Sequence, residues 1–190
     1  FSCIMGMIFL EKRDGMTPHK RIAKELFESG AHCAQAALGA LCDVTGLSLA
    51  DALALSASFG GGVGRMREMC GALSGILIAV GLHFGRYPLG DERTAANKDR
   101  HYRLTQYVCA EFKRKTGSVF CYRLLDLPHA AQVPISQPRT QDFYHARPCL
   151  DLVLAAVEVF DELLEADKNG TLEALISPER AADVTAYLNE

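Results

Sequence analysis

The residue of this sequence that we expect at the centre of a functional site is Cys70, which opens the segment Cys70-Gly71-Ala72-Leu73-Ser74-Gly75. Arg67 precedes Cys70 by one helical turn, and the local pattern predicts that both residues lie in the first turns of a helix. A helix N-terminus and nearby cations lower the pKa of a thiol, and the thiolate is the form that attacks disulfides or binds metals. Cys70 is therefore a candidate nucleophile or metal ligand. A buried structural thiol explains the same residue equally well.

Three further cysteines could share a site with Cys70. Cys33, Cys121 and Cys149 also fall on predicted helices or at their ends, and Cys33 is expected in a first turn, where the helix dipole favours a thiolate. The spacing of the four matches neither a zinc finger nor a ferredoxin-type run. Helical bundles nevertheless build metal sites from side chains that separate helices project inward. The spacing thus permits a four-cysteine metal site without requiring one.

A glycine-rich segment, Phe59-Gly60-Gly61-Gly62-Val63-Gly64-Arg65, stands shortly before Cys70. It fails the Gly-x-Gly-x-x-Gly spacing, no strand is predicted before it, and no Gly-Lys-Ser/Thr follows, so a nucleotide loop is not expected. Two interpretations remain: a tight turn that uses positive φ, or bare backbone whose N–H groups approach an anion or sulfur. On the second interpretation the residues that would contact a cofactor are Gly60, Gly61, Gly62, Gly64 and Gly71.

Helical patterns run through the whole chain. Thr17-Pro18 predicts an N-cap and a first helical residue, Ser48 with Asp51 resembles a capping box, and Gly117 should end a long polar helix. Helices are expected over about residues 17–30, 31–44, 48–58, 67–83, 91–115, 118–125, 146–166 and 177–188, with an irregular crossing at 127–147. No segment alternates like a strand. The prediction is an all-α, compact single-domain bundle of about six to eight helices over residues 16–190, after an extension of uncertain origin at residues 1–15.

Three glycines, Gly71, Gly75 and Gly81, lie inside the predicted helix 67–83. Each lowers the intrinsic stability of a helix. Gly71 and Gly75 are one turn apart on the same face. We expect each of the three to let another backbone approach this helix closely.

Composition argues against two classes of function. The formal net charge of -3 disfavours a nucleic-acid-binding protein, which needs a wide basic face. The longest apolar stretch, residues 72–84, is shorter than the roughly 20 residues of a membrane span, so a buried core helix without membrane insertion is expected. The seven cysteines include no Cys-x-x-Cys pair, and a chain of this size needs no disulfides, which favours a reducing, cytoplasmic location. His32 is expected to point away from Cys33, at the surface or behind the ligands.

Three stretches together resemble the C_GCAxxG_C_C family of redox-active proteins: Gly30-Ala31-His32-Cys33-Ala34-Gln35-Ala36, the glycine segment through Met66, and Glu68-Met69-Cys70-Gly71-Ala72-Leu73-Ser74-Gly75. Cys121-Tyr122-Arg123-Leu124-Leu125 and Cys149 at the start of an apolar helix fit the same pattern, so the likeness covers about residues 17–165. The resemblance implies a small helical redox protein whose four characteristic cysteines fall on Cys33, Cys70, Cys121 and Cys149. It also implies an iron–sulfur cluster as a plausible bound group, with zinc less favoured. Cys3, Cys42, Cys109 and the Pro-containing segment before Cys149 depart from the family pattern.

Three functions stay open on the sequence alone. The first is electron transfer or redox sensing through an iron–sulfur cluster or other metal on the four cysteines, with a redox protein as partner. The second is metal-free thiol–disulfide chemistry in which Cys70 attacks and another cysteine resolves. The third is a structural or partner-binding helical domain with inert or zinc-binding cysteines. The sequence decides neither whether the protein is an enzyme nor whether it forms a homo-oligomer.

Overall fold

The computed structural model describes residues 15–190 except 88, 91–92, 137, 139 and 141–146. The described residues form ten α-helices and one 3-10 turn, with no β-structure beyond one isolated bridge, so the all-α prediction is confirmed. The elements are α1 (Pro18–Glu28), α2 (Cys33–Gly39), α3 (Cys42–Thr45), α4 (Leu49–Ser56), η1 (Ala57–Phe59), α5 (Gly71–Phe84), α6 (Thr94–Thr116), α7 (Cys121–Leu124), α9 (Cys149–Lys168), α10 (Leu172–Leu175) and α11 (Pro178–Asn189). Nearly all of the expected extension, residues 1–14, lies outside the described part.

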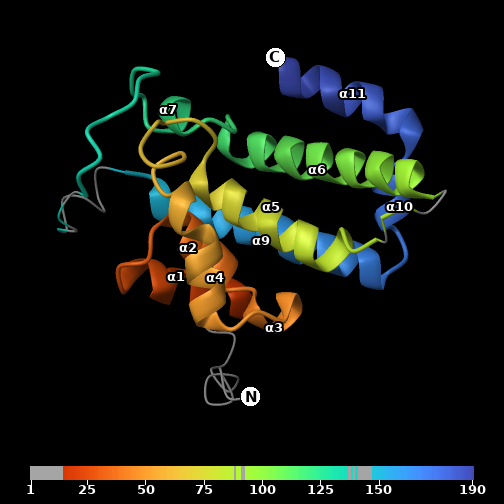
Figure 1. Ribbon diagram of the computed structural model, residues 1–190. Helices are drawn as coiled ribbons and strands as arrows, with labels where there is room; N and C mark the ends of the chain where they lie inside the picture. Colours follow the sequence, from red (N-terminus) through yellow and green to blue (C-terminus); the bar gives the residue numbers. More distant parts are fainter. Residues whose placement is uncertain (1–14, 88, 91–92, 137, 139, 141–146) are drawn as a thin grey trace.

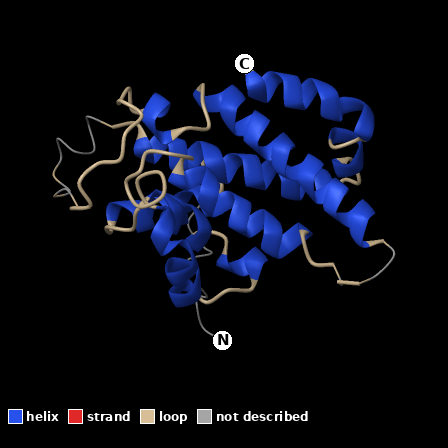
Figure 2. Ribbon diagram, turned by 45° about the horizontal axis from the view of Figure 1, so that its top comes forward, coloured by secondary structure: helices blue, strands red, loops and turns tan. Residues whose placement is uncertain are grey.

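The helices pack around a central pair, α5 and α9, which lie side by side (Figure 1). On one side of this pair, α2 packs against both central helices and is covered by α1 and α4. On the other side, α6 packs against α9 and α5 and carries α11 on its outer face (Figure 2). The four candidate cysteines therefore lie at the ends of helices from different parts of the bundle, α2, α5, α7 and α9.

Capping residues set several helix ends where the sequence predicts them. Thr17 accepts a hydrogen bond from the Lys20 amide at 3.2 Å, and Pro18 is the first residue of α1. Ser48 accepts one from the Asp51 amide at 3.1 Å and donates to the Asp51 carboxylate at 2.6 Å. Gly117, with φ of 91°, ends α6 in the left-handed conformation. These local signals fix where the helices begin and end.

The predicted helix over 31–44 is instead two helices, α2 and α3, with a break after Gly39. A Cβ on Gly39 would lie 2.9 Å from the Leu26 Cδ1 and 3.1 Å from the Leu49 Cδ1, so glycine gives these two side chains room at the end of α2. This break, with the one-turn α10, raises the number of described helices above the six to eight expected.

The glycines of α5 confirm close helix packing at two positions and not at the third. A Cβ on Gly75 would lie 2.6 Å from the carbonyl oxygen of Ala34 in α2, and one on Gly71 would lie 2.7 Å from that of Phe59. A Cβ on Gly81 would meet nothing within 4 Å, so the expectation of close approach there is wrong. The closest contact of α5 is thus with α2, at the end that begins next to Cys70.

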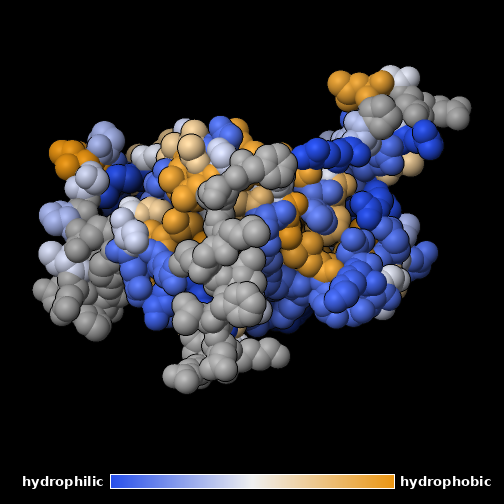
Figure 3. Space-filling view, turned by 90° about the horizontal axis from the view of Figure 1, so that it is seen from below, coloured by the Kyte–Doolittle hydropathy of each residue, from blue (hydrophilic) through white to orange (hydrophobic). Residues whose placement is uncertain are grey.

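The core is continuous through the central helices. The apolar stripe predicted for the 146–166 helix is buried in α9 from Cys149 to Leu163, and only Leu164 of that stripe is half-buried. On the face shown in Figure 3, hydrophilic residues surround smaller apolar areas. No helix of the described residues is both long enough and apolar enough to span a bilayer.

Candidate functional site

The four predicted cysteines line a single cavity of about 280 Å³. Cys33, Cys121 and Cys149 are the first residues of α2, α7 and α9, and Cys70 is the residue immediately before α5. The Cys33 thiol is hydrogen bonded to Cys149, and Cys70 and Cys121 are close enough to interact electrostatically with both. All six cysteines of the described residues are free thiols. Residues far apart in the sequence therefore meet at one point in the fold.

A short antiparallel pairing brings Cys70 next to Cys121. The Cys70 amide donates to the Val119 carbonyl at 2.8 Å, and the Cys121 amide donates to the Glu68 carbonyl at 2.7 Å. An isolated bridge joins Met69 to Phe120 between them. This pairing holds residues 68–70 outside a helix, so α5 begins at Gly71, and the predicted helix start near residue 67 is wrong.

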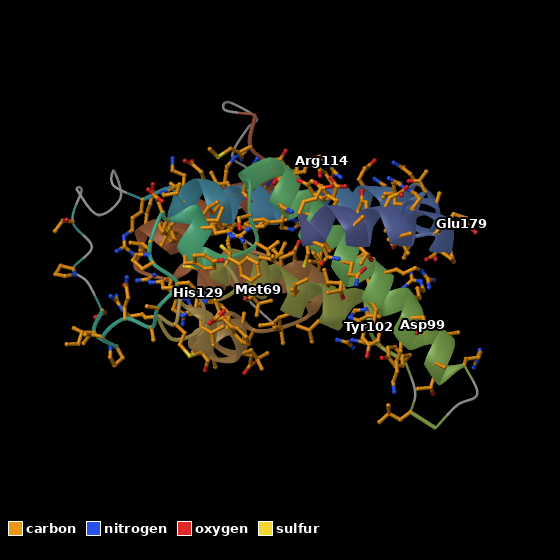
Figure 4. The ribbon with its side chains drawn as sticks, turned by 90° about the horizontal axis from the view of Figure 1, so that it is seen from above. Met69, Asp99, Tyr102, Arg114, His129 and Glu179 are labelled. Carbon is orange, nitrogen blue, oxygen red and sulfur yellow. The ribbon has the colours of Figure 1, made fainter. Side chains whose placement is uncertain are left out.

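The pairing also orders the loop that follows α7. In Figure 4, Met69 and His129 lie on the same side of the molecule, away from Asp99 and Tyr102 of α6. His129 hydrogen bonds to the Glu68 carboxylate at 3.1 Å and stacks on the Tyr122 ring. The described residues from 126 to 147 form no helix, as the sequence predicts.

The glycine segment forms the wall of the cavity beside Cys121. A Cβ on Gly62 would lie 2.6 Å from the Cys121 Cβ, so only glycine allows the backbone this close. Gly60, Gly61, Gly62 and Gly71 line the cavity, whereas Gly64 does not. Gly61, Gly62 and Gly64 have positive φ, as do Val63 and Arg65, which fits the tight-turn interpretation. Whether the segment contacts a bound group stays a prediction.

Burial keeps the thiols protonated rather than ionised. Burial raises the pKa of Cys70 to about 12, although the amides of Ala72 and Leu73 act in the opposite direction. The hydrogen bond to Cys149, together with burial, raises the pKa of Cys33 well above its usual value. The expectation that helix starts and arginines make Cys33 and Cys70 thiolates is therefore wrong for the metal-free protein, because desolvation outweighs both effects.

Arg67 is the site residue that sequence reasoning misjudged. Its side chain is only 1% exposed, and its backbone φ of 67° is incompatible with the predicted helix. One terminal nitrogen donates to the Cys121 Sγ at 3.8 Å, and the other donates to the Gln132 Oε1 at 2.5 Å. Arg65 donates to the same Gln132 oxygen at 3.3 Å. Both arginines line the cavity, and the Nε atom of each is buried without a hydrogen-bond partner.

The donor set of the cavity is four cysteines. Within the described part of the chain, no three Cys, His, Asp or Glu side chains are placed to hold one metal ion. A tetrahedral ion such as Zn²⁺ would need the sulfurs at about 2.3 Å from one centre. Iron–sulfur clusters are also ligated by four cysteine thiolates, so the number and kind of donors match that group.

The remaining cysteines lie elsewhere. Cys42 is buried and donates to the Gly39 carbonyl at 3.2 Å, and burial in the core raises the pKa of Cys109 to about 11. Neither lines the cavity, and Cys3 lies outside the described residues. His32 caps α2, and its half-exposed ring lines the cavity against Gly60.

The fold and the site define an all-helical protein in which four cysteines line one pocket. Residues 31–163 match the family described as "Putative redox-active protein (C_GCAxxG_C_C)". An uncharacterized protein of Archaeoglobus fulgidus is 30% identical over 145 residues, which cover 74% of this chain and 89% of that protein. No solved structure matches the chain. The chain belongs to the C_GCAxxG_C_C family of redox-active proteins.

Proposed function

We propose that the protein transfers electrons or senses redox state through an iron–sulfur cluster, or another metal group, held by Cys33, Cys70, Cys121 and Cys149. One observation carries this proposal: four cysteines from the starts of four helices line one cavity. A bound cluster would supply one-electron chemistry at a potential that its surroundings set. A redox protein would be the partner, and a reducing cytoplasm would keep the thiols available for ligation.

Different residues of the chain would ligate such a group, position its ligands and tune its potential. The four cysteines bind it, and the antiparallel pairing fixes the relative positions of Cys70 and Cys121. The helix starts at α5 and α9 present partial positive charge, which favours thiolates once a metal replaces their protons. Gly61 and Gly62 bring their backbone to the cavity wall, where N–H groups can donate to sulfur and tune the potential.

A second candidate function is thiol–disulfide exchange, which the hydrogen bond between Cys33 and Cys149 favours. In that reaction the two thiols would lose two protons and two electrons to a disulfide of a partner protein. One bond would form between the Cys33 and Cys149 sulfurs, and the partner's disulfide would become two thiols. The raised pKa of Cys33 argues against rapid attack, since the thiolate is the nucleophile.

Single Cys→Ser substitutions test the proposal. Each change at Cys33, Cys70, Cys121 or Cys149 should reduce the iron bound after anaerobic reconstitution. Cys109→Ser is the matched control, because Cys109 is buried like Cys70, Cys121 and Cys149 but lies away from the cavity. Iron binding that depends on none of the four cysteines, or equally on Cys109, would rule out the four-cysteine site. Thiol exchange would be favoured instead if the iron-free protein reduces a partner's disulfide and the Cys33→Ser and Cys149→Ser variants do not.

A further inference from the structure

Arg67 is a buried cation for which the described residues supply no anionic partner. Arg67 is 1% exposed, and its two terminal nitrogens donate to the neutral amide of Gln132 and to the Cys121 sulfur. Its Nε atom has no hydrogen-bond partner, and no carboxylate pairs with Arg67 among the residues that the structure describes. Burying an unpaired guanidinium is costly, since its charge loses hydration without gaining a counter-charge.

The surroundings of Arg67 add positive charge. Burial lowers the pKa of Arg65, and repulsion from Arg67 and Arg147 lowers it further, so these three cations lie within electrostatic reach of one another. All three line the cavity. Arg65 and Arg67 both donate to the uncharged Gln132 Oε1. Two guanidinium groups on one neutral acceptor repel each other, and a nearby anion would relieve this repulsion.

We propose that Arg67 is the built-in counter-charge of the four-cysteine site: it positions Cys121 and makes the cavity selective for a bound group of net negative charge. This inference rests on the proposed function and deepens it. Four thiolates around an iron–sulfur cluster retain net negative charge, whereas four thiols or two disulfides are neutral. With the anionic group bound, Arg67 gains the partner that the described residues do not supply in the metal-free protein. The positive charge of Arg67 also attracts the additional electron of the reduced group, so it favours the reduced form.

The inference predicts that removing this charge has opposite effects on the two states of the protein. Arg67→Met keeps an apolar stem of similar length and removes the guanidinium. In the metal-free protein at pH 6, where the thiols are protonated, the variant should unfold at a higher urea concentration than the wild type. After anaerobic reconstitution the same variant should bind iron about 10- to 100-fold more weakly, the range typical when a group behind a metal ligand is lost. Its reduction potential should shift to more negative values.

Two further variants serve as controls. Arg67→Lys retains the charge. It should therefore retain most of the iron affinity and a reduction potential closer to that of the wild type than to that of Arg67→Met. Arg123→Met removes a cation two residues from Cys121, but the Arg123 side chain lies over the Phe120 and Tyr122 rings and does not line the cavity. Arg123→Met should therefore leave iron affinity and potential unchanged.

The experiment separates failure of this inference from failure of the proposed function. Wild-type protein that takes up neither iron nor another metal would remove the proposed function. The inference is overturned if metal-free Arg67→Met unfolds at lower urea than the wild type, because the guanidinium would then already be compensated. It is also overturned if Arg67→Met and Arg123→Met bind iron with the same affinity.

Discussion

Replacing Gly62 with alanine is the sharpest test of how the glycine segment positions Cys121. The added Cβ would lie 2.6 Å from the Cys121 Cβ and 2.9 Å from both the Arg67 Cα and the Glu68 nitrogen. Because two of these contacts are to backbone, rotation of a side chain cannot relieve them. We expect Gly62→Ala to push Cys121 away from the cavity and to lower both stability and iron binding.

The magnitude follows from two separate costs. Gly62 has φ of 69°, and a non-glycine residue in that conformation costs about 1–2 kcal/mol. Overpacking a tight site typically adds about 1–3 kcal/mol. Gly64 is the matched control, because its φ is 56° and an added Cβ would meet nothing within 4 Å. Gly64→Ala should therefore cost only about 1–2 kcal/mol, from the backbone conformation alone.

Equilibrium urea unfolding of the two variants measures the difference, and iron content after anaerobic reconstitution measures the effect on the site. Gly62→Ala should be less stable than Gly64→Ala by about 1–3 kcal/mol, the overpacking cost. Only Gly62→Ala should lose iron. Equal destabilisation by the two changes, or full iron content in Gly62→Ala, would refute the role given to this close approach.

Two other predictions concern the scaffold. Gly75→Ala should destabilise the protein by about 1–3 kcal/mol, because its Cβ would meet α2 backbone. Gly81→Ala in the same helix should stabilise the protein by up to about 1 kcal/mol. Urea unfolding distinguishes these signs, and stabilisation by both changes would contradict the packing described. Burial alone would lower the pKa of His19, but hydrogen bonds to Asp161 and Asp43 raise it to about 9. This stabilisation is complete below about pH 6.5 and is lost as pH rises through about 9. Because solvent screens the partly exposed ion pair, the stability advantage of wild type over His19→Gln should shrink by about 2 kcal/mol between pH 6 and pH 10, less than the full shift in pKa implies. A pH-independent difference would show that His19 is not held as a cation.

The parts of the fold that were predictable from the sequence depend on local signals. Thr17, Ser48 and Gly117 act through bonds to residues three or four positions away, so their roles can be recognised without tertiary structure. The apolar stripe of α9 is likewise a local periodicity. The break after Gly39 was missed because the pattern over residues 31–44 continues across it.

The site was predictable only in part, for the same reason. The resemblance to the family selected the four cysteines that line the cavity, whereas their spacing could not show that they meet. The start of α5 was misplaced because the pairing with residues 119–122 holds residues 68–70 outside a helix. The burial of Arg67 was not foreseen, because arginines are rarely buried and its contacts are to Gln132 and Cys121, far along the chain.

The central claim is that the four cysteines ligate an iron–sulfur cluster, and chemical analysis of protein purified without exposure to air tests it most directly. Iron and acid-labile sulfide should be present together, and the visible spectrum should show absorption that bleaches on reduction. The quadruple Cys33→Ser, Cys70→Ser, Cys121→Ser, Cys149→Ser variant should contain neither element. Colourless wild-type protein that is fully folded, contains no iron and takes up none on anaerobic reconstitution would contradict the account.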